Sequence, residues 1–395
     1  MKVVINGVGV AGPALAWWLT RSGHEVTLVE QASALRAGGY VVDFWGVGYE
    51  VAERMGLVPR LLELGYQAQE VRFVDRSGRK TGGFATDVFA RATGGRFTSI
   101  RRSDLAATIY EALDGRVETI FGDSVAAIDE CGAQVHLEFE HAAPRTADLL
   151  IGADGLHSRV RALTFGVESA FEVPLGYHVA AFEVTDYRPR DELVYVTYGV
   201  PGRQISRFAL RDDRTLFLCI FRDAYLPGGR MHSSPADEER RATIRRIFGG
   251  LGWESAQIVA AMDEASEVYF DTVSQIRLPR WTSGRTALIG DAAACVSLLA
   301  GEGTGLAMAE AYVLAAALAT TSDHTAAFAD YERRMMPFLM GKQRSAARLA
   351  SSFVPKSALG LRFRDLVTRF MRIPAVADWF IARDLRDAIV LPPMP

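Results

Sequence analysis

Three glycines near the N-terminus have the spacing of a phosphate-binding turn. Gly7, Gly9 and Gly12 form the pattern G-x-G-x-x-G between an apolar run at residues 2–6 and a segment with apolar residues at helical spacing. In such a turn the first glycine bends the chain, the second lets the backbone reach a pyrophosphate, and the third lets the helix approach the strand. The helix dipole also favours bound phosphates. The sequence therefore predicts a strand, a dinucleotide-binding turn and a helix.

One acidic residue completes this pattern. Glu30 lies 18 residues beyond Gly12, at the end of the next predicted strand. A carboxylate at this place accepts hydrogen bonds from a ribose 2′-OH, whereas it would repel a 2′-phosphate. We therefore expect the tightly held nucleotide to be FAD or NAD rather than NADP.

A second segment combines an aspartate with a glycine-rich helix start. Residues 290–305, GDAAACVSLLAGEGTG, place Gly290 and Asp291 directly after an apolar strand and continue through small residues into a helix. Gly301 and Gly303 lie where that helix begins. N–H groups at a helix N-terminus stabilise negative charge on a ligand, and glycines let the ligand approach the backbone.

Two segments carry a resemblance to a known family. Residues 148–161, DLLIGADGLHSRVR, and residues 287–305 resemble the second and third FAD motifs of the class A flavoprotein monooxygenases, which have the fold of para-hydroxybenzoate hydroxylase. The resemblance covers nearly the whole chain. Within that family, the segments LRAGGYVVDF and RRSDLAATIYEAL look most similar to the flavin-dependent tetracycline hydroxylases and related natural-product oxygenases.

The resemblance implies a set of residues that hold noncovalent FAD. Asp291 is expected to bind the ribityl 3′-hydroxyl, and the helix opening near Gly303 is expected to point its N–H groups at the N1/O2 edge of the flavin. Asp154 belongs to a motif that serves the FAD pyrophosphate and passing NAD(P)H, with Arg161 bracing its loop. Val125 is expected to lend backbone groups to the adenine. The full expected set is Gly7, Gly9, Gly12, Glu30, Gln31, Arg36, Arg102, Val125, Asp154, Gly290, Asp291, Gly301, Gly303 and Thr304.

Two arginines in this set suit a diphosphate. The resemblance places Arg102 at the FAD linker and Arg36 near the pyrophosphate. The planar guanidinium can donate two parallel hydrogen bonds to phosphate oxygens. For either arginine the alternative is a solvated surface charge.

The third motif departs from the family pattern at two places. The usual histidine after GDAA is replaced by Ala294, and the usual proline by Ser297 or Leu298, depending on the alignment. That proline helps to shape the oxygen-reacting part of the site in relatives. The departure therefore concerns oxygen handling and leaves FAD binding untouched.

The chemistry implied by the resemblance is the cofactor's. NADPH or NADH reduces FAD, O₂ adds at C4a, and the hydroperoxide delivers one oxygen to a bulky aromatic or polycyclic substrate, such as a natural product. Alternatives are a flavin-dependent halogenase, a reductase of isoprenoid chains, and a non-catalytic flavin redox sensor. The halogenase is disfavoured because the chain has no WxWxIP segment and very few lysines.

The substrate is expected against an antiparallel sheet formed by residues 176–271. No catalytic residue is identified by the sequence, but His178 is a candidate base for a phenol and Arg207 a candidate clamp for an acid. The substrate's own enolate or phenolate can replace a protein base. The candidate substrate contacts are Phe182, Tyr198, Phe208, Phe217 and Phe221.

These sites require an α/β fold with two interleaved domains. A Rossmann-like FAD domain is predicted from residues 1–70, 98–175 and 272–350, and an antiparallel-sheet substrate domain from residues 71–97 and 176–271. Residues 351–395 form a predicted C-terminal helical segment. Its Leu361, Phe363, Leu366 and Phe370 have helical spacing and are expected to pack over the domain interface.

Composition narrows the partners. The chain has 395 residues, a formal charge of −3 and three separated cysteines, so neither nucleic-acid binding, a disulfide framework nor a metal site is indicated. No signal peptide or membrane span is predicted, because the first strand starts at Lys2 and the apolar run after Gly305 contains Glu310. We expect a cytoplasmic monomer or homodimer that takes a small molecule and O₂.

Overall fold

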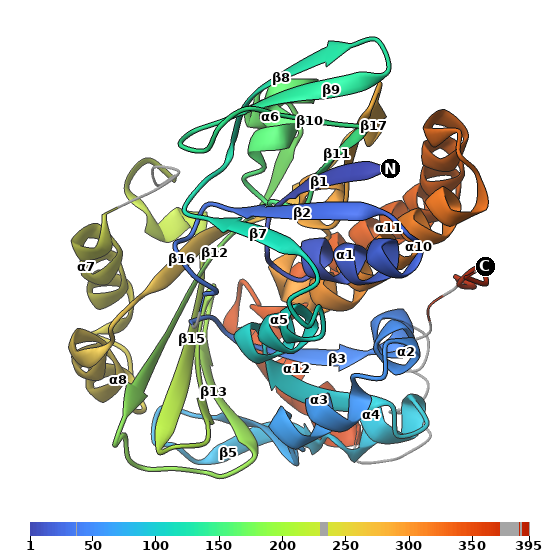
Figure 1. Ribbon diagram of the computed structural model, residues 1–395. Helices are drawn as coiled ribbons and strands as arrows, with labels where there is room; N and C mark the ends of the chain where they lie inside the picture. Colours follow the sequence, from blue (N-terminus) through green and yellow to red (C-terminus); the bar gives the residue numbers. More distant parts are fainter. Residues whose placement is uncertain (37, 230–235, 372–386, 388, 395) are drawn as a thin grey trace.

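The structure is a computed structural model that describes residues 1–36, 38–229, 236–371, 387 and 389–394. Strands and helices alternate in the N-terminal part, an antiparallel sheet follows, and helices close the chain (Figure 1). The predicted α/β class is confirmed. Residues 372–386, within the predicted C-terminal segment, lie outside the described residues.

The first βαβ unit forms as predicted. Strand β1 (Lys2–Asn6) pairs in parallel with β2 (Glu25–Glu30), and helix α1 (Ala11–Arg21) connects them. This unit belongs to a six-stranded sheet in the order β17-β18-β11-β1-β2-β7. The remaining strands of this sheet are β7 (Glu118–Phe121), β11 (Leu149–Gly152), β17 (Thr282–Ser283) and β18 (Thr286–Leu288).

A seven-stranded sheet forms the other half of the molecule, in the order β16-β12-β15-β14-β13-β4-β5. Neighbouring strands are antiparallel except that β13 and β4 run parallel. Its strands are β4 (Glu70–Val74), β5 (Lys80–Ala85), β12 (Glu172–Thr185), β13 (Val194–Val200), β14 (Arg203–Ala209), β15 (Arg214–Arg222) and β16 (Tyr269–Ile276).

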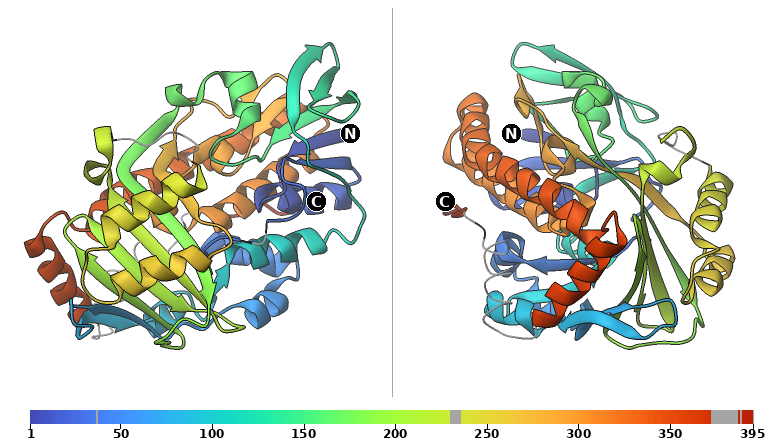
Figure 2. Two further views of the ribbon diagram at one scale, coloured as in Figure 1. Left: turned by 90° about the vertical axis from the view of Figure 1, so that its left-hand side faces the viewer. Right: turned by 180° about the vertical axis from the view of Figure 1, so that it is seen from behind.

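Different elements cover the two faces of this sheet, which we call the outer and inner faces. Helices α7 (Asp237–Phe248) and α8 (Ser255–Ala261) pack on the outer face (Figure 2). The inner face contacts residues of the N-terminal half, including Tyr40 and Tyr66, and Leu298 of the glycine-rich segment. Any ligand held by that segment therefore lies on the inner side.

Smaller elements join the two sheets. A two-stranded sheet is formed by β3 (Val41–Trp45) and β6 (Phe97–Arg101), and β8 (Val125–Cys131), β9 (Gln134–Phe139) and β10 (Arg145–Ala147) form a three-stranded sheet. The remaining helices of the N-terminal half are α2 (Gly46–Arg54), α3 (Val58–Leu64), α4 (Asp87–Ala92), α5 (Arg102–Glu111) and α6 (Arg159–Phe165). Short 3-10 turns are η1 (Glu168–Ala170), η2 (Asp223–Tyr225), η3 (Pro227–Gly229), η4 (Met262–Glu264) and η5 (Leu298–Ala300).

The C-terminal half returns to the first sheet. Helix α9 (Asp291–Ala294) leads through η5 to α10 (Gly303–Thr320), which packs against α1, α2 and α11 (His324–Phe353). By length and composition α10 could cross a membrane, but 83% of that helix is buried inside the protein. It serves here as the central core helix.

Helix α12 (Ala358–Phe370) confirms the predicted helix but not the predicted packing face. Phe363, Leu366 and Phe370 are exposed, whereas Leu361 is half-buried beside Gly199 of β13, and Thr368 is buried and donates to the carbonyl of Asp365. Asp365 also accepts a hydrogen bond from Thr81 of β5. The helix therefore binds the inner-face end of the sheet through its polar side.

Candidate functional site

The glycine turn has the geometry that its spacing predicts. Gly7 has φ +116°, and a Cβ added there would lie 2.3 Å from the carbonyl oxygen of Ala153. A Cβ on Gly12 would lie 2.0 Å from the oxygen of Gly7. A Cβ on Gly9 would meet nothing closer than the Arg102 guanidinium, at 3.8 Å. Close packing thus requires glycine at positions 7 and 12, whereas Gly9 leaves open space where a pyrophosphate is expected.

Glu30 lies directly beside this turn. Its Oε2 accepts the N–H of Val8 at 2.8 Å, and its Oε1 accepts the N–H of Ala32 at 2.9 Å. These bonds hold the carboxylate at the end of β2, where a ribose is expected. Gln31 and Arg36 are exposed at the beginning of the following loop.

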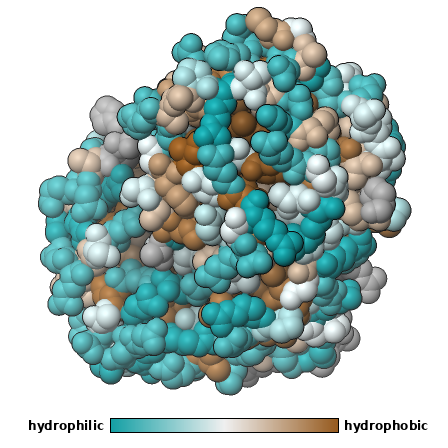
Figure 3. All heavy atoms as spheres, viewed as in Figure 1, coloured by the Kyte–Doolittle hydropathy of each residue, from teal (hydrophilic) through white to brown (hydrophobic). Residues whose placement is uncertain are grey.

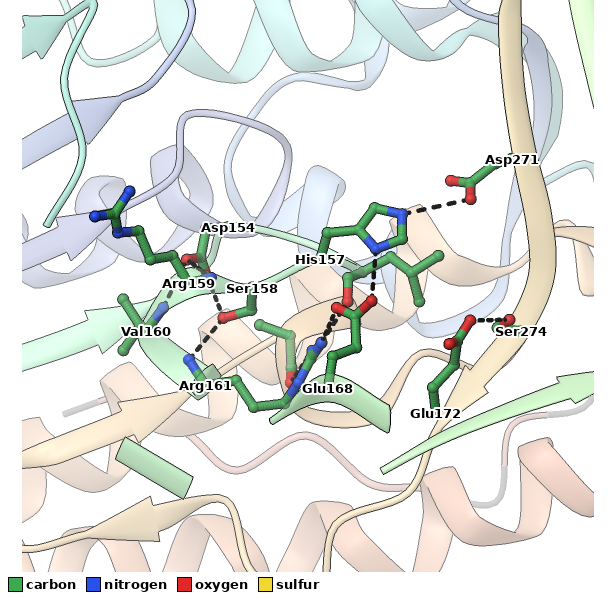
Figure 4. Close-up of polar contacts among 12 residues, drawn as sticks. Asp154, His157, Ser158, Arg159, Val160, Arg161, Glu168, Glu172, Asp271 and Ser274 are labelled. Carbon is green, nitrogen blue, oxygen red and sulfur yellow. Dashed lines mark hydrogen bonds and ion pairs between the residues drawn. The ribbon is translucent and has the colours of Figure 1, made fainter. Parts of the chain in front are cut away.

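Asp154 organises its own loop. Its carboxylate accepts the N–H groups of Arg159 at 2.8 Å and Val160 at 3.0 Å, so it binds the first turn of α6 (Figure 4). It also accepts the side-chain amide of Asn6 at 3.1 Å. The Asp154 side chain therefore fixes the loop after β11 beside the end of β1.

Val125 does not offer its amide to a ligand. Its N–H donates to Oδ1 of Asn6 at 3.2 Å, and its side chain is fully buried. This N–H is therefore engaged within the protein, and a contact of the adenine with the backbone of Val125 stays a prediction. Asn6 was not predicted as a site residue, although a polar residue at the end of an otherwise apolar strand could have drawn attention to it.

Asp291 lies beneath the start of α10. A Cβ on Gly303 would lie 3.7 Å from Oδ1 of Asp291. Burial raises the pKa of Asp291, while the positive charge of Arg102 acts in the opposite direction. The neighbouring Thr304 hydroxyl is buried and has no partner among the described residues. A desolvated acceptor, an unpaired hydroxyl and open glycines fit a polyhydroxylated cofactor chain.

Arg102 connects the two halves of the expected cofactor site. Burial acts to lower the pKa of Arg102, but Tyr40, Asp291, Tyr269 and Glu30 together raise it above its usual value. The guanidinium thus interacts electrostatically with two carboxylates: Glu30 at the end of β2, where the ribose is expected, and Asp291 before α10. This is the position required of a cation that binds the diphosphate linking those two ends.

Glu310 is a site residue that the sequence reasoning missed. Its Oε2 accepts the N–H of Gly290 at 3.0 Å and the hydroxyl of Tyr331 at 2.8 Å. Burial raises the pKa of Glu310 well above its usual value. The carboxyl fixes the turn that presents Asp291. The available signal was a lone acid in the apolar segment of α10.

Arg161 connects the second and third motifs. Its guanidinium donates to the carbonyls of Ala292 at 3.1 Å and Leu156 at 2.6 Å, and lies 2.7 Å from Oε2 of Glu168. The contacts with Leu156 and Ala292 tie the loop after β11 to the GDAA segment. They are consistent with the bracing role expected from the resemblance.

His157 completes a charged cluster at this place. Its Nδ1 lies 2.9 Å from Glu168, and its Nε2 lies 3.4 Å from Asp271 on β16 (Figure 4). Hydrogen bonding to Asp271 and then to Glu168 raises the pKa of His157 to about 10. Asp271 in turn accepts the Tyr269 hydroxyl at 3.1 Å. The cluster joins the motif loop to the seven-stranded sheet.

Most of the expected substrate contacts lie on the outer face. Phe182, Tyr198, Phe217 and Phe221 pack in the core beneath α7 and α8. Side chains alternate between faces along a strand, so these four cannot reach the inner side. Phe208 lies on the inner face, where its ring is 4.1 Å from the ring of Tyr195. Phe208 alone is retained from the expected set.

His178 and Arg207 also belong to the outer face. The His178 ring stacks on Phe221, its Nε2 lies 3.2 Å from Asp223, and burial lowers its pKa. Arg207 donates to Glu254 at 2.8 Å and to Asp191 at 2.7 Å. These contacts satisfy both groups inside the substrate domain, which corrects their candidacy as base and acid clamp.

Aromatic residues that were not singled out from the sequence line the inner side. Tyr40 lies 5.7 Å from Tyr269 between ring centroids, and burial raises the pKa of Tyr40 to about 12. Trp45 approaches Gly301, since a Cβ on that glycine would lie 4.0 Å from the indole. Apolar residues also reach the surface near the middle of one side of the molecule, within a hydrophilic surround (Figure 3).

The departures from the third motif are accommodated locally. Ala294 is buried, and the Ser297 hydroxyl accepts the N–H of Leu299 at 3.2 Å. Ser297 thereby starts the turn η5 that precedes Gly301. Among the described residues, no group of three or more His, Cys, Asp or Glu side chains is placed to hold a metal ion.

Comparison with known proteins agrees with this arrangement. A family described as "FAD binding domain" matches residues 1–338. A flavin-dependent monooxygenase from an unknown prokaryotic organism is 30% identical over 367 residues, which cover 91% of each chain. The crystal structure of tetracycline destructase Tet(51) has a TM-score of 0.83 at 27% identity and covers 99% of each chain. Klebsiella pneumoniae HpxO, solved with FAD and uric acid, has a TM-score of 0.77 at 25% identity and covers 97% of each chain.

Proposed function

This chain belongs to the FAD binding domain family and is an FAD-dependent monooxygenase, and we propose that it uses NAD(P)H to oxidise a bulky aromatic or polycyclic small molecule. The family gives no support to the halogenase, isoprenoid reductase and redox-sensor alternatives. The proposal extends to the substrate class, the reductant, the residues that hold FAD and a cytoplasmic location.

The position of Arg102 carries the assignment of the FAD residues. It lies within electrostatic reach of Glu30 at one end and Asp291 at the other. In our proposal Glu30 binds the adenosine ribose, Arg102 the diphosphate, and Asp291 the ribityl chain. The N-terminus of α1 adds its dipole on the diphosphate side, and the residue before that helix, Val10, has no polar side chain that would occupy the first-turn N–H groups.

The first turn of α10 is proposed to face the flavin ring. Gly301 has φ +69° in the left-handed region, and Gly303 begins the helix. Amides fixed at a helix N-terminus stabilise negative charge without adding a titratable group. When bound, FAD supplies the electron transfer and oxygen activation of the reaction. The protein supplies the position of the ring and an apolar surround.

The inner face supports an aromatic substrate with little charge. Tyr195 and Phe208 stack there, and Tyr40 and Tyr269 lie closer to Asp291 and Arg102. Two arginines of this face are already engaged with an acid, since Arg101 lies 3.0 Å and Arg214 3.4 Å from Glu183. A small carboxylate substrate would have to compete with Glu183 for them. A flat apolar ring system would not.

The test is reduction of the bound FAD in the presence of candidate substrates. The purified protein is mixed anaerobically with NADPH or NADH, with and without polycyclic phenols, enols or small hydroxybenzoates, and flavin bleaching is followed by stopped-flow absorbance. We expect faster bleaching with polycyclic compounds and oxygenated product after admission of air. Stimulation by hydroxybenzoates alone would contradict the proposed substrate class. Consumption of NAD(P)H without product from any compound would contradict the proposed reaction.

A further inference from the structure

Glu302 stands directly before α10 and places a carboxylate beside the first turn of that helix. A carboxylate near a helix start is attracted by the helix dipole and can accept hydrogen bonds from the N–H groups of the first turn. Glu302 makes no such side-chain cap. Its Oε2 instead lies 2.7 Å from Nζ of Lys342 on α11. The carboxylate is thus drawn away from the amides that are proposed to face the flavin.

Lys342 binds a second carboxylate at the same place. Its Nζ lies 2.8 Å from Oδ1 of Asp387, and the other oxygen of Asp387 accepts the N–H of Val47 at 2.6 Å. The side chains of Lys342, Glu302 and Asp387 are 12%, 17% and 11% exposed. Burial acts to lower the pKa of Lys342, but the attraction of Glu302 and Asp387 outweighs it, so the pKa is raised overall and the ammonium is charged.

The three charged residues act on a tightly packed junction. A Cβ on Gly48 of α2 would lie 2.2 Å from the Cα of Gly305, so α2 and α10 meet backbone to backbone. Asp387 binds the start of α2, while Glu302 precedes the start of α10. A small cavity beside them is lined by residues that include Glu302, Gly305 and Asp387. Lys342 therefore links both helix starts through a single charge.

We propose that Lys342 is a positioning residue that holds the Glu302 carboxylate away from the start of α10 and neutralises it, and so sets the reduction potential of the bound FAD. Reduction adds negative charge to the ring edge that faces these amides. An uncompensated carboxylate at the helix start would oppose that charge and would also compete for the amides. Removal of Lys342 alone should therefore make the flavin harder to reduce.

The inference rests on the proposed placement of FAD against α10. The experiment measures the two-electron reduction potential of FAD in the holoenzyme, by dye equilibration, for the wild type, Lys342→Met, Lys342→Arg, Glu302→Gln and the double variant Glu302→Gln/Lys342→Met. Lys356→Met, which removes an exposed lysine, is the matched control. Thermal melting of each apoprotein reports folding independently of the flavin.

We expect Lys342→Met to shift the oxidised-to-reduced ratio about tenfold toward oxidised FAD, which is about 30 mV for a two-electron couple. Lys342→Arg should retain the wild-type value because it keeps the charge. Glu302→Gln should make FAD easier to reduce, and the double variant should return to within about threefold of the wild-type ratio. The Lys356→Met control should match the wild type.

An unchanged potential in Lys342→Met, or a double variant as hard to reduce as Lys342→Met, would overturn the proposal. If Lys342→Met fails to fold, the Glu302→Gln variant alone tests the inference. A reduction potential of Glu302→Gln equal to or below that of the wild type would then refute it. Failure of the proposed function is distinct. The potential needs no substrate, whereas the substrate class is tested by stimulated flavin bleaching, and wild-type protein that binds no FAD would refute the site itself.

Discussion

A desolvated carboxylate is costly unless its partners compensate for the lost water, and Asp291 lies in that position. Burial raises its pKa, and the opposing influences are the charge of Arg102 and a hydrogen bond from the Cys295 thiol. A desolvated acid is tolerated where a ligand completes its hydrogen bonds. The unpartnered hydroxyl of Thr304 lies in the same turn region and calls for the same completion. Both groups are explained by a cofactor chain that carries hydroxyls.

Replacement of Asp291 by alanine should weaken FAD binding. A hydrogen bond to a charged acceptor contributes about 1.5–3 kcal/mol, so the dissociation constant should rise by about one to two powers of ten. Flavin fluorescence titration of the apoprotein gives the constant. Asp129→Ala, at an exposed position on β8, is the control and should bind as the wild type does. Equal affinity in both variants would remove Asp291 from the site.

His157 predicts a specific dependence of stability on pH. Its pKa in the folded protein is about 10, against an ordinary value of 6.5. A raised pKa gives stabilisation that is complete below pH 6.5 and is lost progressively as the pH rises toward about 10. The wild type should therefore melt above His157→Gln at pH 6 to 7, and the difference should shrink toward pH 10.

Melting curves at several pH values, followed by circular dichroism, test this dependence. The imidazole is half exposed, so solvent screens its ion pairs and the effect is expected to be modest. His136→Gln replaces an exposed histidine on β9 and should show no comparable trend. A wild-type advantage that is the same from pH 6 to pH 10 would show that the charge of His157 does not contribute.

At the scale of elements, the helix starts decide how the site is built. Helices α1 and α10 begin without side-chain caps, and both direct their first turns toward places where a cofactor is expected. Helix α6 is capped instead, by Ser158 and Asp154. Uncapped starts leave first-turn N–H groups available to a ligand, but α2, α3, α4, α5, α7 and α8 also begin without side-chain caps, so the place of α1 and α10 beside the expected cofactor is what distinguishes them. The contact of α2 with α10 then fixes the position of the first turn of α10.

Substitution of Gly48 by alanine should disturb that contact. The added Cβ would lie 2.2 Å from the Cα of Gly305, and neither backbone can move without shifting a helix. Overpacking of this kind costs about 1–3 kcal/mol. The melting temperature should fall and FAD affinity should fall with it. Gly341→Ala, inside α11 with no close neighbour at its Cβ, should instead be neutral or stabilise by about 0.5–1 kcal/mol.

The features that could be predicted from the sequence are the motifs whose residues lie within one short stretch of the chain. The glycine turn, Glu30 and the GDAA segment are each read within one short stretch, and the elements around them form as expected. Contacts between distant stretches were not predictable. The N–H of Val125 binds Asn6, 119 positions earlier, and Arg161 reaches Ala292, 131 positions later. Only the folded chain reveals that such groups are already engaged.

Which face of the seven-stranded sheet meets the flavin could not be predicted from the sequence, for a different reason. Along β12 and β15, residues of both alternations are apolar, because the sheet is covered on both sides. Alternation then separates two sets of side chains but cannot say which set meets the flavin. Phe182 and Phe217 were chosen from the set that meets α7 and α8. Phe208 belongs to the other set.

At the scale of the whole molecule, the two faces of the seven-stranded sheet have different roles: the outer face contributes to stability, and the inner face is expected to contribute to substrate specificity as well. The outer face with α7 and α8 forms a largely apolar core that also buries His178 and Arg207. The inner face is shared with the N-terminal half, the glycine-rich segment and α12, which binds β5 from this side. We therefore expect a substrate that reacts with the flavin to be recognised between the two halves. Specificity is expected to depend on inner-face residues, and stability on both faces.

A pair of phenylalanines tests this division. Phe208→Leu and Phe217→Leu make the same chemical change on opposite faces, and each should lower the free energy of unfolding by up to about 1.5 kcal/mol. Loss of an aromatic wall contact should also raise the half-saturating substrate concentration of Phe208→Leu about tenfold, with FAD affinity unchanged. Phe217→Leu should keep the wild-type value, because its ring lies on the outer face, against Phe182 and Tyr187. Substrate-stimulated flavin bleaching measures both variants under identical conditions. A larger shift in Phe217→Leu than in Phe208→Leu would place the substrate elsewhere than on the inner face.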